Sequence, residues 1–262
     1  MKITAPLGAL LALVLAGAVS ASAKPPQNFK VLLYTSPDRY HNQAIPAAVT
    51  QFERLAEKNF FGLTWTQLPT DLNPDNLKQY AVVVFLFSNA RELNAEQIDA
   101  LKGHLHQGGG FVGIHASSVD SKQDIWFKKL VGRTFRGHPE KQTGIIDVVD
   151  KSFPATMHLP DRWVWTDEWY EFGDALTDNQ HVLLTVDEST YEPLETKQPD
   201  GTVRRGMGGQ HPIAWYQEYD GGRSFYTALG HARISYDDPL FLMHLYGGIY
   251  WAATGKGAPA AK

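Results

Sequence analysis

The chain contains 262 residues, with 24 lysines and arginines against 28 aspartates and glutamates, and it has no cysteine. Its formal net charge of −4 and the scatter of its 10 histidines exclude the basic patch that binding to nucleic acid requires. Without cysteine, the protein cannot carry a lipid-modified cysteine, a disulfide framework or a thiol nucleophile.

The first 23 residues have the pattern of a secretory signal peptide. Lys2 precedes an apolar run from Leu7 to Val19, and the small residues Ala21-Ser22-Ala23 follow this run. We expect cleavage near Ala23, which leaves residues 24–262 as a single domain in the periplasm or outside the cell. The run is short for a membrane span and no later segment reaches that length, so we expect no membrane insertion of the mature chain.

Hydrophobic patterning in the first half of the chain alternates between strands and helices. Apolar residues recur at helical spacing after Ile45, and a second helix is capped by Asn94 and ends at Gly108. The predicted strands are Phe29–Thr35, Leu63–Gln67, Ala81–Phe87 and Phe111–Ile114. The third of these is apolar throughout, which indicates a strand covered on both faces. Strands that alternate with helices pair in parallel, so the pattern predicts an α/β fold with a mainly parallel sheet.

The second half of the chain predicts strands with fewer helices between them. The predicted strands are Gly144–Val149, His181–Val186, and a hairpin of Pro212–Tyr219 and Arg223–Leu229. Asp238-Pro239 begins a last helix that continues through Trp251. The polar residues 188–210 contain the turn Pro199-Asp200-Gly201. We expect a surface excursion there, either a lid or a solvated insertion.

His115 lies in the most informative motif of the chain. The strand that ends at Ile114 continues into the turn Gly113-Ile114-His115-Ala116-Ser117, which has the Gly-x-X-x-small form of a nucleophile elbow. Such a turn presents one side chain at the carboxyl edge of a sheet, and here that side chain is an imidazole. Covalent acyl chemistry is therefore not expected, and His115 is either a reactive histidine or a structural, hydrogen-bonded one.

Other polar residues follow the predicted strands at the same edge, where open parallel sheets bind ligands. They are Tyr40 and His41 after the first strand, Asn89 after the central strand, and Ser117 after the elbow strand. His138 and His211 each precede a proline, which restricts the backbone and the direction of the ring. His211 and His231 lie at the same end of the predicted hairpin, so we expect them to share a pocket.

Carboxylates and aromatic residues are concentrated between Arg162 and Phe172. Aromatic faces such as that of Trp169 stack on sugar rings, and a carboxylate near apolar surface, such as Glu168, can have a raised pKa suited to proton transfer. The alternative is an aromatic core strand whose acidic residues face solvent. Two carboxylates alone do not establish a glycosidase, because the acid and base must flank one bond at a defined separation.

Several motifs in the same order along the chain resemble the trehalose-utilisation (ThuA-like) family. They are Tyr40-His41, Gly108–Ser117, Gly137-His138-Pro139, Thr166–Tyr170, Asp187–Tyr191, His211–Trp215 and Tyr226–His231. The resemblance implies a flavodoxin-like, class I glutamine amidotransferase-like three-layer sandwich and a role in carbohydrate metabolism, on glycosides or their 3-keto derivatives. The absent cysteine excludes glutamine hydrolysis. The longer stretch from Glu192 to Gly208 departs from the family pattern.

The preferred hypothesis is an enzyme that cleaves or rearranges a small carbohydrate by acid–base chemistry. Its predicted catalytic residues are His115, Glu168 and His41, and its predicted substrate-binding residues are Tyr40, Asn89, Ser117, His138, Trp169, His211 and His231. One alternative is a Zn²⁺- or Mn²⁺-dependent hydrolase or lyase, because several histidines and a carboxylate can bind a metal. Another is a sugar-binding protein without catalysis. No cofactor other than a divalent metal is indicated.

Overall fold

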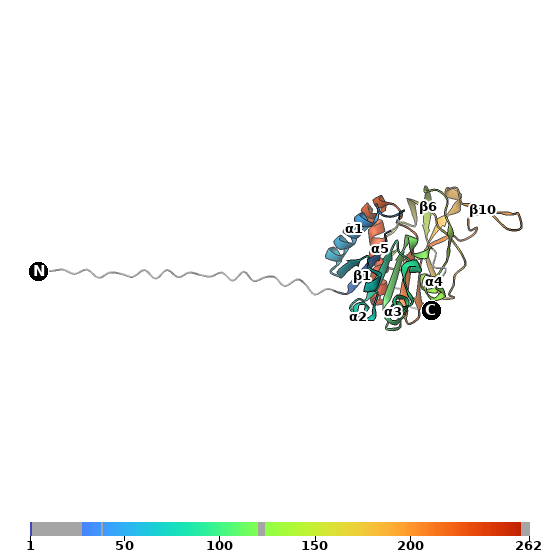
Figure 1. Cartoon of the computed structure of the whole chain (residues 1–262). Helices are drawn as coiled ribbons and strands as arrows, with labels where there is room; N and C mark the ends of the chain where they lie inside the picture. Colours follow the sequence, from blue (N-terminus) through green and yellow to red (C-terminus); the bar gives the residue numbers. More distant parts are fainter. Residues whose placement is uncertain (2–27, 38, 120–123, 258–262) are drawn as a thin grey trace.

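A nine-stranded sheet forms the centre of the computed structural model, which describes Met1 and residues 28–37, 39–119 and 124–257 (Figure 1). The strand order is β2-β1-β3-β4-β13-β12-β9-β6-β7. These strands are β1 (Lys30–Thr35), β2 (Gly62–Thr66), β3 (Val82–Leu86), β4 (Gly110–Ile114), β6 (Gln142–Val148), β7 (Arg162–Asp167), β9 (His181–Asp187), β12 (Pro212–Tyr219) and β13 (Gly222–Thr227). The predicted cleavage site near Ala23 lies outside the described residues.

The strands β2, β1, β3, β4 and β13 pair in parallel. β3 is buried along its whole length, from Val82 to Leu86, because layers of helices cover both faces of this part of the sheet. The strands predicted for the first half of the chain are confirmed, with small differences at their ends. Their carboxyl ends, which carry the polar loops, meet at one edge of the sheet.

Helices pack on both faces of the sheet, as the α/β prediction requires. They are α1 (Ile45–Asn59), α2 (Pro74–Leu77), α3 (Ala95–His106), α4 (Ile125–Val131) and α5 (Pro239–Thr254). Gly110 of β4 approaches Ala252 of α5, whereas the ring of the next residue, Phe111, packs 5.7 Å from that of Phe127 in α4. Neighbouring residues of a strand point to opposite faces, so α5 and α4 lie on opposite sides of the sheet.

Local signals in the sequence account for the ends of these helices. Asn94 caps α3 in a capping box with Gln97, and Asp238 caps α5 by accepting the backbone N–H groups of Leu240 and Phe241. Short 3₁₀ helices connect the larger elements: η1 (Pro69–Asp71), η2 (Ala90–Glu92), η3 (His115–Ser118), η4 (Glu188–Thr190) and η5 (Arg233–Asp237). α2 and α4 were not predicted, because each is too short to establish a helical period.

The antiparallel part of the sheet is larger than the predicted hairpin. β12 pairs with β13 and also with β9, and β6 then joins β9 to β7 at the sheet edge. Alternate residues of β7 are buried and exposed, which is the pattern of a strand with one face toward the core. A separate pair, β5 (Phe135–Gly137) and β8 (Glu171–Phe172), lies beside this region.

The predicted excursion at residues 188–210 forms its own antiparallel hairpin. β10 (Glu195–Lys197) pairs with β11 (Val203–Arg205), and Gly201 adopts a positive φ of 87° in the connecting turn. Figure 1 shows the hairpin projecting from the body of the molecule on the side opposite α1. Its ion pair between Arg204 and the buried Glu171, at 2.8 Å, connects it to β8.

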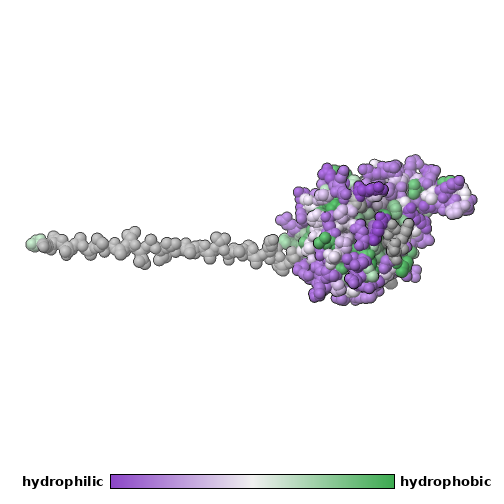
Figure 2. All heavy atoms as spheres, viewed as in Figure 1, coloured by the Kyte–Doolittle hydropathy of each residue, from purple (hydrophilic) through white to green (hydrophobic). Residues whose placement is uncertain are grey.

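Polar residues cover most of the face seen in Figure 2, with apolar residues scattered among them. The large apolar side chains are instead collected around the sheet, where Phe85, Phe111 and Phe127 form a mutually packed group. None of the helices in the described part of the chain is long and apolar enough to cross a membrane.

Candidate functional site

A pocket of about 780 Å³ opens at the carboxyl ends of the parallel strands. Its lining includes the predicted residues Tyr40, His41, Asn89, His138, Glu168 and His231, together with Arg39, Arg91, Ala116, Val119, Phe135, Glu140 and Tyr170. Loops after β1, β3, β4 and β13 supply one side, and the segments after β7 and β5 supply the other. The pocket therefore opens at the sheet edge that the sequence indicated.

The elbow after β4 holds His115 directly behind this lining. His115 has a positive φ of 54°, and its carbonyl accepts a hydrogen bond of 2.7 Å from the hydroxyl of Tyr226. Its ring is fully buried, and Nδ1 donates to the carbonyl oxygen of Ala228 at 2.6 Å. Because a carbonyl can only accept, Nδ1 carries a proton, and in the neutral form of the ring Nε2 presents a lone pair.

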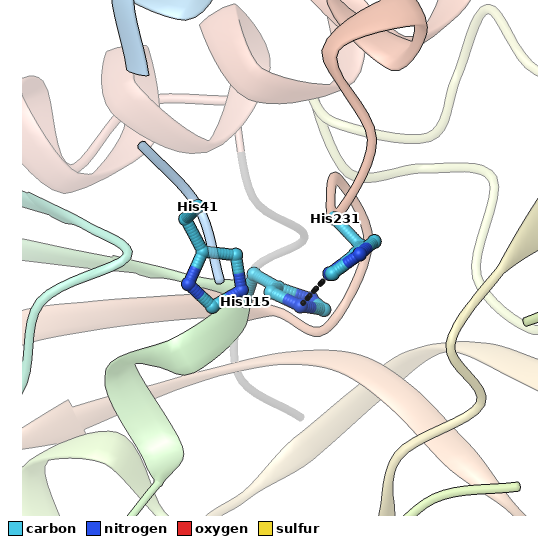
Figure 3. A group of neighbouring side chains, drawn as sticks. All are labelled: His41, His115 and His231. Carbon is cyan, nitrogen blue, oxygen red and sulfur yellow. Dashed lines mark hydrogen bonds between the residues drawn. The ribbon is translucent and has the colours of Figure 1, made fainter. Parts of the chain in front are cut away.

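Three side chains converge at the floor of the pocket, which we call the His–Glu cluster: His115, His231 and Glu168. Nε2 of His115 lies 3.3 Å from Nδ1 of His231. A dashed line marks this contact in Figure 3. Oε2 of Glu168 lies 3.4 Å from the former nitrogen and 3.2 Å from the latter. The ring of His41 packs edge-on against both imidazoles, with centroid distances of 5.1 and 5.3 Å.

Electrostatics in the His–Glu cluster favour a carboxylate beside a protonated histidine. Burial alone would raise the pKa of Glu168, but hydrogen bonds and charge interactions with His115 and His231 outweigh burial and hold the pKa well below its usual range. The hydrogen bond to Glu168 raises the pKa of His231, although partial burial opposes this. The expectation of a raised pKa for Glu168 is therefore wrong, because it considered the aromatic neighbours and not the imidazoles.

Two further residues of this site were missed in the sequence. The buried carboxylate of Asp167 accepts the backbone N–H groups of Gly230 at 2.8 Å, His231 at 3.2 Å and Glu168 at 2.9 Å. It thereby joins the loop after β13 to the loop after β7. The hydroxyl of Tyr170 lies 2.8 Å from Nε2 of His115. Asp167 could have been found, because inward-pointing residues alternate along β7 and place it on the buried face.

The aromatic segment around β7 combines features of both interpretations drawn from the sequence. Trp163 and Trp165 are core residues, as the alternative interpretation required. Asp167 is fully buried and Glu168 lines the pocket, so these acidic residues do not face open solvent.

Three predicted substrate-binding residues lie outside the pocket lining. Ser117 is fully buried and donates to the carbonyl of Phe85, so it stabilises the elbow turn. Trp169 is fully buried in the core, beside Tyr191. His211 is also fully buried and does not share the pocket of His231, because β12 and its preceding loop direct it toward the excursion. Asn89 lines the pocket and also caps η2 through the backbone N–H of Arg91.

Three histidines in and directly behind the pocket lining are of the kind that bind metal ions. His41, His115 and His231 each offer a ring nitrogen, and these three atoms lie within 4.8 Å of one another. Imidazole nitrogens suit zinc and other transition metals. The histidines come from loops after three different strands, so no short spacing in the sequence connects them.

Solved structures with this fold include other ThuA-like proteins. One from Bacteroides uniformis ATCC 8492 has 26% sequence identity and a TM-score of 0.74, and the match covers 91% of this chain and 96% of that chain. One from Parabacteroides merdae ATCC 43184 has 20% identity and a TM-score of 0.68, with 90% and 93% covered. A beta-galactosidase from Bacillus circulans sp. alkalophilus shares the fold alone, with 12% identity, a TM-score of 0.51, and 84% and 30% covered.

Sequence comparison gives the family. No curated protein sequence matches the chain. The sequence model of the ThuA family, described as trehalose utilisation, matches residues 30–252. The mixed sheet with helices on both faces also fits the class I glutamine amidotransferase-like superfamily. The chain therefore belongs to the ThuA family.

Proposed function

We propose that this protein is an exported enzyme that cleaves or rearranges a glycoside, or the 3-keto derivative of a glycoside, by proton transfer. The observation that carries the proposal is the convergence of His115, His231 and Glu168 within 3.2 to 3.4 Å at the floor of the pocket. Membership of a carbohydrate-utilisation family supports a sugar substrate. The pocket volume of about 780 Å³ falls within the range of small-ligand sites.

The walls of the pocket suit a sugar ring. Tyr40 and Phe135 offer aromatic surface, on which the apolar face of a pyranose can stack. Asn89 and Arg91 bring polar groups that can hydrogen-bond to hydroxyls. In this arrangement the sugar is held between aromatic walls, above the His–Glu cluster.

His138 and His231 have the positions of a base and an acid. Nδ1 of His138 donates to the carbonyl of Pro139 at 2.8 Å, so Nε2 of the neutral ring carries the lone pair. This Nε2 lies 3.6 Å from Glu168, whose charge stabilises the imidazolium that forms when His138 accepts a proton. His231, with its raised pKa, is the proton donor. His115 is buried behind these groups and acts as a positioning residue.

For a 3-keto glycoside, these roles produce an elimination. His138 removes the proton from C2, which the neighbouring ketone makes acidic, and the electrons of the C–H bond form a double bond between C1 and C2. The bond between C1 and the glycosidic oxygen breaks, and that oxygen takes the proton of His231. Proton exchange with solvent then restores both rings, and no covalent intermediate forms.

Product analysis by mass spectrometry tests this proposal, with ordinary and 3-keto disaccharides as substrates. Turnover in Glu168→Gln should fall by about 10²–10⁴-fold, because the variant loses the charge that supports both histidines. Glu192→Gln is the matched control, since Glu192 is 83% exposed in a surface ion pair with Arg205 and is not part of the pocket lining. Sugar binding without product would instead identify a sugar-binding protein, and full turnover in Glu168→Gln would overturn the proton-transfer mechanism.

Export is tested separately by fractionation of cells that express the full chain. We expect the protein in the periplasm or medium, with an amino terminus at Lys24 by protein sequencing. A cytoplasmic protein that retains Met1 would contradict export, but it would not bear on the proposed proton-transfer mechanism.

A further inference from the structure

We infer that the His–Glu cluster, together with His41, binds one Zn²⁺-class divalent transition-metal ion at the floor of the pocket. This inference concerns the site of the proposed function and deepens that function by naming the electrophile. The inference rests on the arrangement of the donor atoms, and metal binding at this site can be measured without any sugar.

The first observation is that lone pairs face one another. Nδ1 of His115 donates to the carbonyl of Ala228 at 2.6 Å, which directs the lone pair of its Nε2 toward Nδ1 of His231 and Oε2 of Glu168. Oε2 of Glu168 and the unprotonated ring nitrogens repel one another unless a proton or a metal ion lies between them. The hydroxyl of Tyr170, 2.8 Å from the same Nε2, donates to it in the metal-free protein, and a bound ion would displace that hydrogen bond.

The second observation is the match between the three separations and the geometry of a metal site. A tetrahedral ion with bonds of about 2.0–2.1 Å to nitrogen and oxygen separates its ligand atoms by about 3.3 Å. The measured distances are 3.3 Å between His115 and His231, 3.4 Å between His115 and Glu168, and 3.2 Å between His231 and Glu168. The three atoms therefore already form one face of such a tetrahedron.

His41 supplies the remaining donor. Its ring nitrogen lies within 4.8 Å of those of His115 and His231, and its side chain is 5% exposed. The ring stacks on Phe87 with a centroid distance of 4.6 Å and an interplanar angle of 9°, which restricts its orientation. Figure 3 shows the three imidazoles approaching one another from separate loops.

The surrounding hydrogen bonds are those that metal sites use to orient their ligands. A metal-binding histidine commonly donates its other ring N–H to a carbonyl or carboxylate, as His115 does to Ala228. Asp167 holds the backbones of His231 and Glu168. Three imidazoles and one carboxylate favour zinc over the hard ions Mg²⁺ and Ca²⁺, which prefer oxygen ligands.

A bound ion would replace the proton that His231 and Glu168 otherwise share, so in the metal-bound protein the ion, and not a proton from His231, would stabilise the charge on the departing glycosidic oxygen. It would supply the positive charge that polarises a substrate oxygen, while His138 remains at the pocket lining as the proton-accepting group.

Metal titration of the signal-free chain tests the inference. Protein dialysed against EDTA is titrated with Zn²⁺ by calorimetry and with Co²⁺ by visible absorption. We expect one ion per chain and a tetrahedral-type Co²⁺ spectrum. His41→Ala, His231→Asn and Glu168→Gln should each weaken Zn²⁺ binding by about 10-fold to more than 100-fold.

The matched control is His106→Ala, which removes an exposed imidazole at the opposite end of the sheet, beside Asp220. Circular dichroism verifies the fold of each variant. Addition of Zn²⁺ should raise the melting temperature of the wild-type chain and of His106→Ala, but not that of a folded cluster variant. Less than one ion per chain, or equal binding by wild type and all cluster variants, would overturn the inference.

The outcomes separate this inference from the proposed function. Stoichiometric zinc binding without turnover of any sugar supports the metal site and counts against the enzyme. Sugar turnover by a protein that binds no zinc supports the enzyme and overturns the metal site.

Discussion

His211 donates from Nε2 to the backbone carbonyl of Tyr170 at 2.9 Å, directly behind the pocket that Tyr170 lines. The other ring nitrogen of His211 lies 2.7 Å from Oε1 of Glu188, which also accepts the backbone N–H of Met207 at 2.6 Å. The excursion at residues 188–210 is thus tied to the pocket through one buried imidazole. His211 supports the site from behind and has no route to a substrate in this pocket.

Glu188→Gln should loosen this connection. Burial raises the pKa of Glu188, but hydrogen bonds from His211, Met207 and Gly208 outweigh burial and lower it, so the carboxylate form is the one that stabilises the fold. Loss of that charge beside a buried ring should reduce the free energy of unfolding by about 2 kcal/mol. Hydrogen exchange should accelerate at Met207 and Gly208.

Glu192→Gln provides the comparison for this prediction. Glu192 pairs with Arg205 at the surface, with its side chain 83% exposed. Exposed ion pairs contribute little, so this change should leave the free energy of unfolding nearly unaltered. Equal effects of the two substitutions, measured by urea denaturation, would contradict the role given to Glu188.

Asp167→Asn should disturb the pocket by releasing two of its loops. An amide cannot reproduce the full set of hydrogen bonds that the carboxylate accepts from the backbone of Gly230, His231 and Glu168 and from the indole of Trp165. We expect Zn²⁺ affinity to fall by about 10- to 100-fold while the variant remains folded at 25 °C. Calorimetry measures the affinity, and Asp161→Asn, which alters only an exposed pair with Lys151, should match the wild type.

Two glycine-to-alanine substitutions in helices should have opposite effects. At Gly247 in α5 a Cβ would lie 2.3 Å from the backbone oxygen of Pro154, whereas at Gly103 in α3 it would meet nothing within 4 Å. Gly247→Ala should lower the free energy of unfolding by about 1–3 kcal/mol, because backbone must shift. Gly103→Ala should raise it by up to about 1 kcal/mol through helix propensity. Chemical denaturation of both variants gives the comparison, and a stable Gly247→Ala protein would refute the packing described for α5.

Stability should decrease in mild acid because of His244. Burial lowers the pKa of His244 to about 4, although its hydrogen bond to the carbonyl of Ala155 opposes this. The folded state therefore binds fewer protons than the unfolded state below pH ~6.5, and stability falls until the pH reaches about 4. This one group should cost about 3 kcal/mol across that interval.

The variant His244→Asn should show a smaller loss of stability between these pH values, whatever its stability at pH 8. His181→Asn, at an exposed position, should keep the wild-type dependence. Urea denaturation at a series of pH values measures both curves, and parallel curves for wild type and His244→Asn would show that another group is responsible.

Much of the fold could be predicted because its signals are local and repeated. The apolar segment around β3, the cap at Asn94 and the Asp238-Pro239 helix start each correspond to an observed element. The pocket edge was also predictable, since parallel strands bring the loops that carry His41 and His115 to one place.

The composition of the pocket was harder to predict, because it depends on where each side chain points. Trp169 and Glu168 are adjacent in the sequence, yet only Glu168 faces the pocket. His211 precedes β12 and His231 follows β13 at the same end of the hairpin, yet the half-buried carboxylate of Glu188 on the excursion pairs with His211 and not with His231. The lowered pKa of Glu168 depends on imidazoles that come from β4 and β13, which no local pattern could reveal.

The order of the strands has a consequence for splitting the gene. β13 lies between β4 and β12 and so connects the parallel part of the sheet to the antiparallel part. The loop that carries His231 follows β13, and it therefore takes up its position only when both parts have formed. A fragment that ends before β6 contains His41 and His115 but neither Glu168 nor His231. Two separately expressed halves would therefore each be inactive alone. Activity recovered on mixing the halves would show that the domain has reassembled.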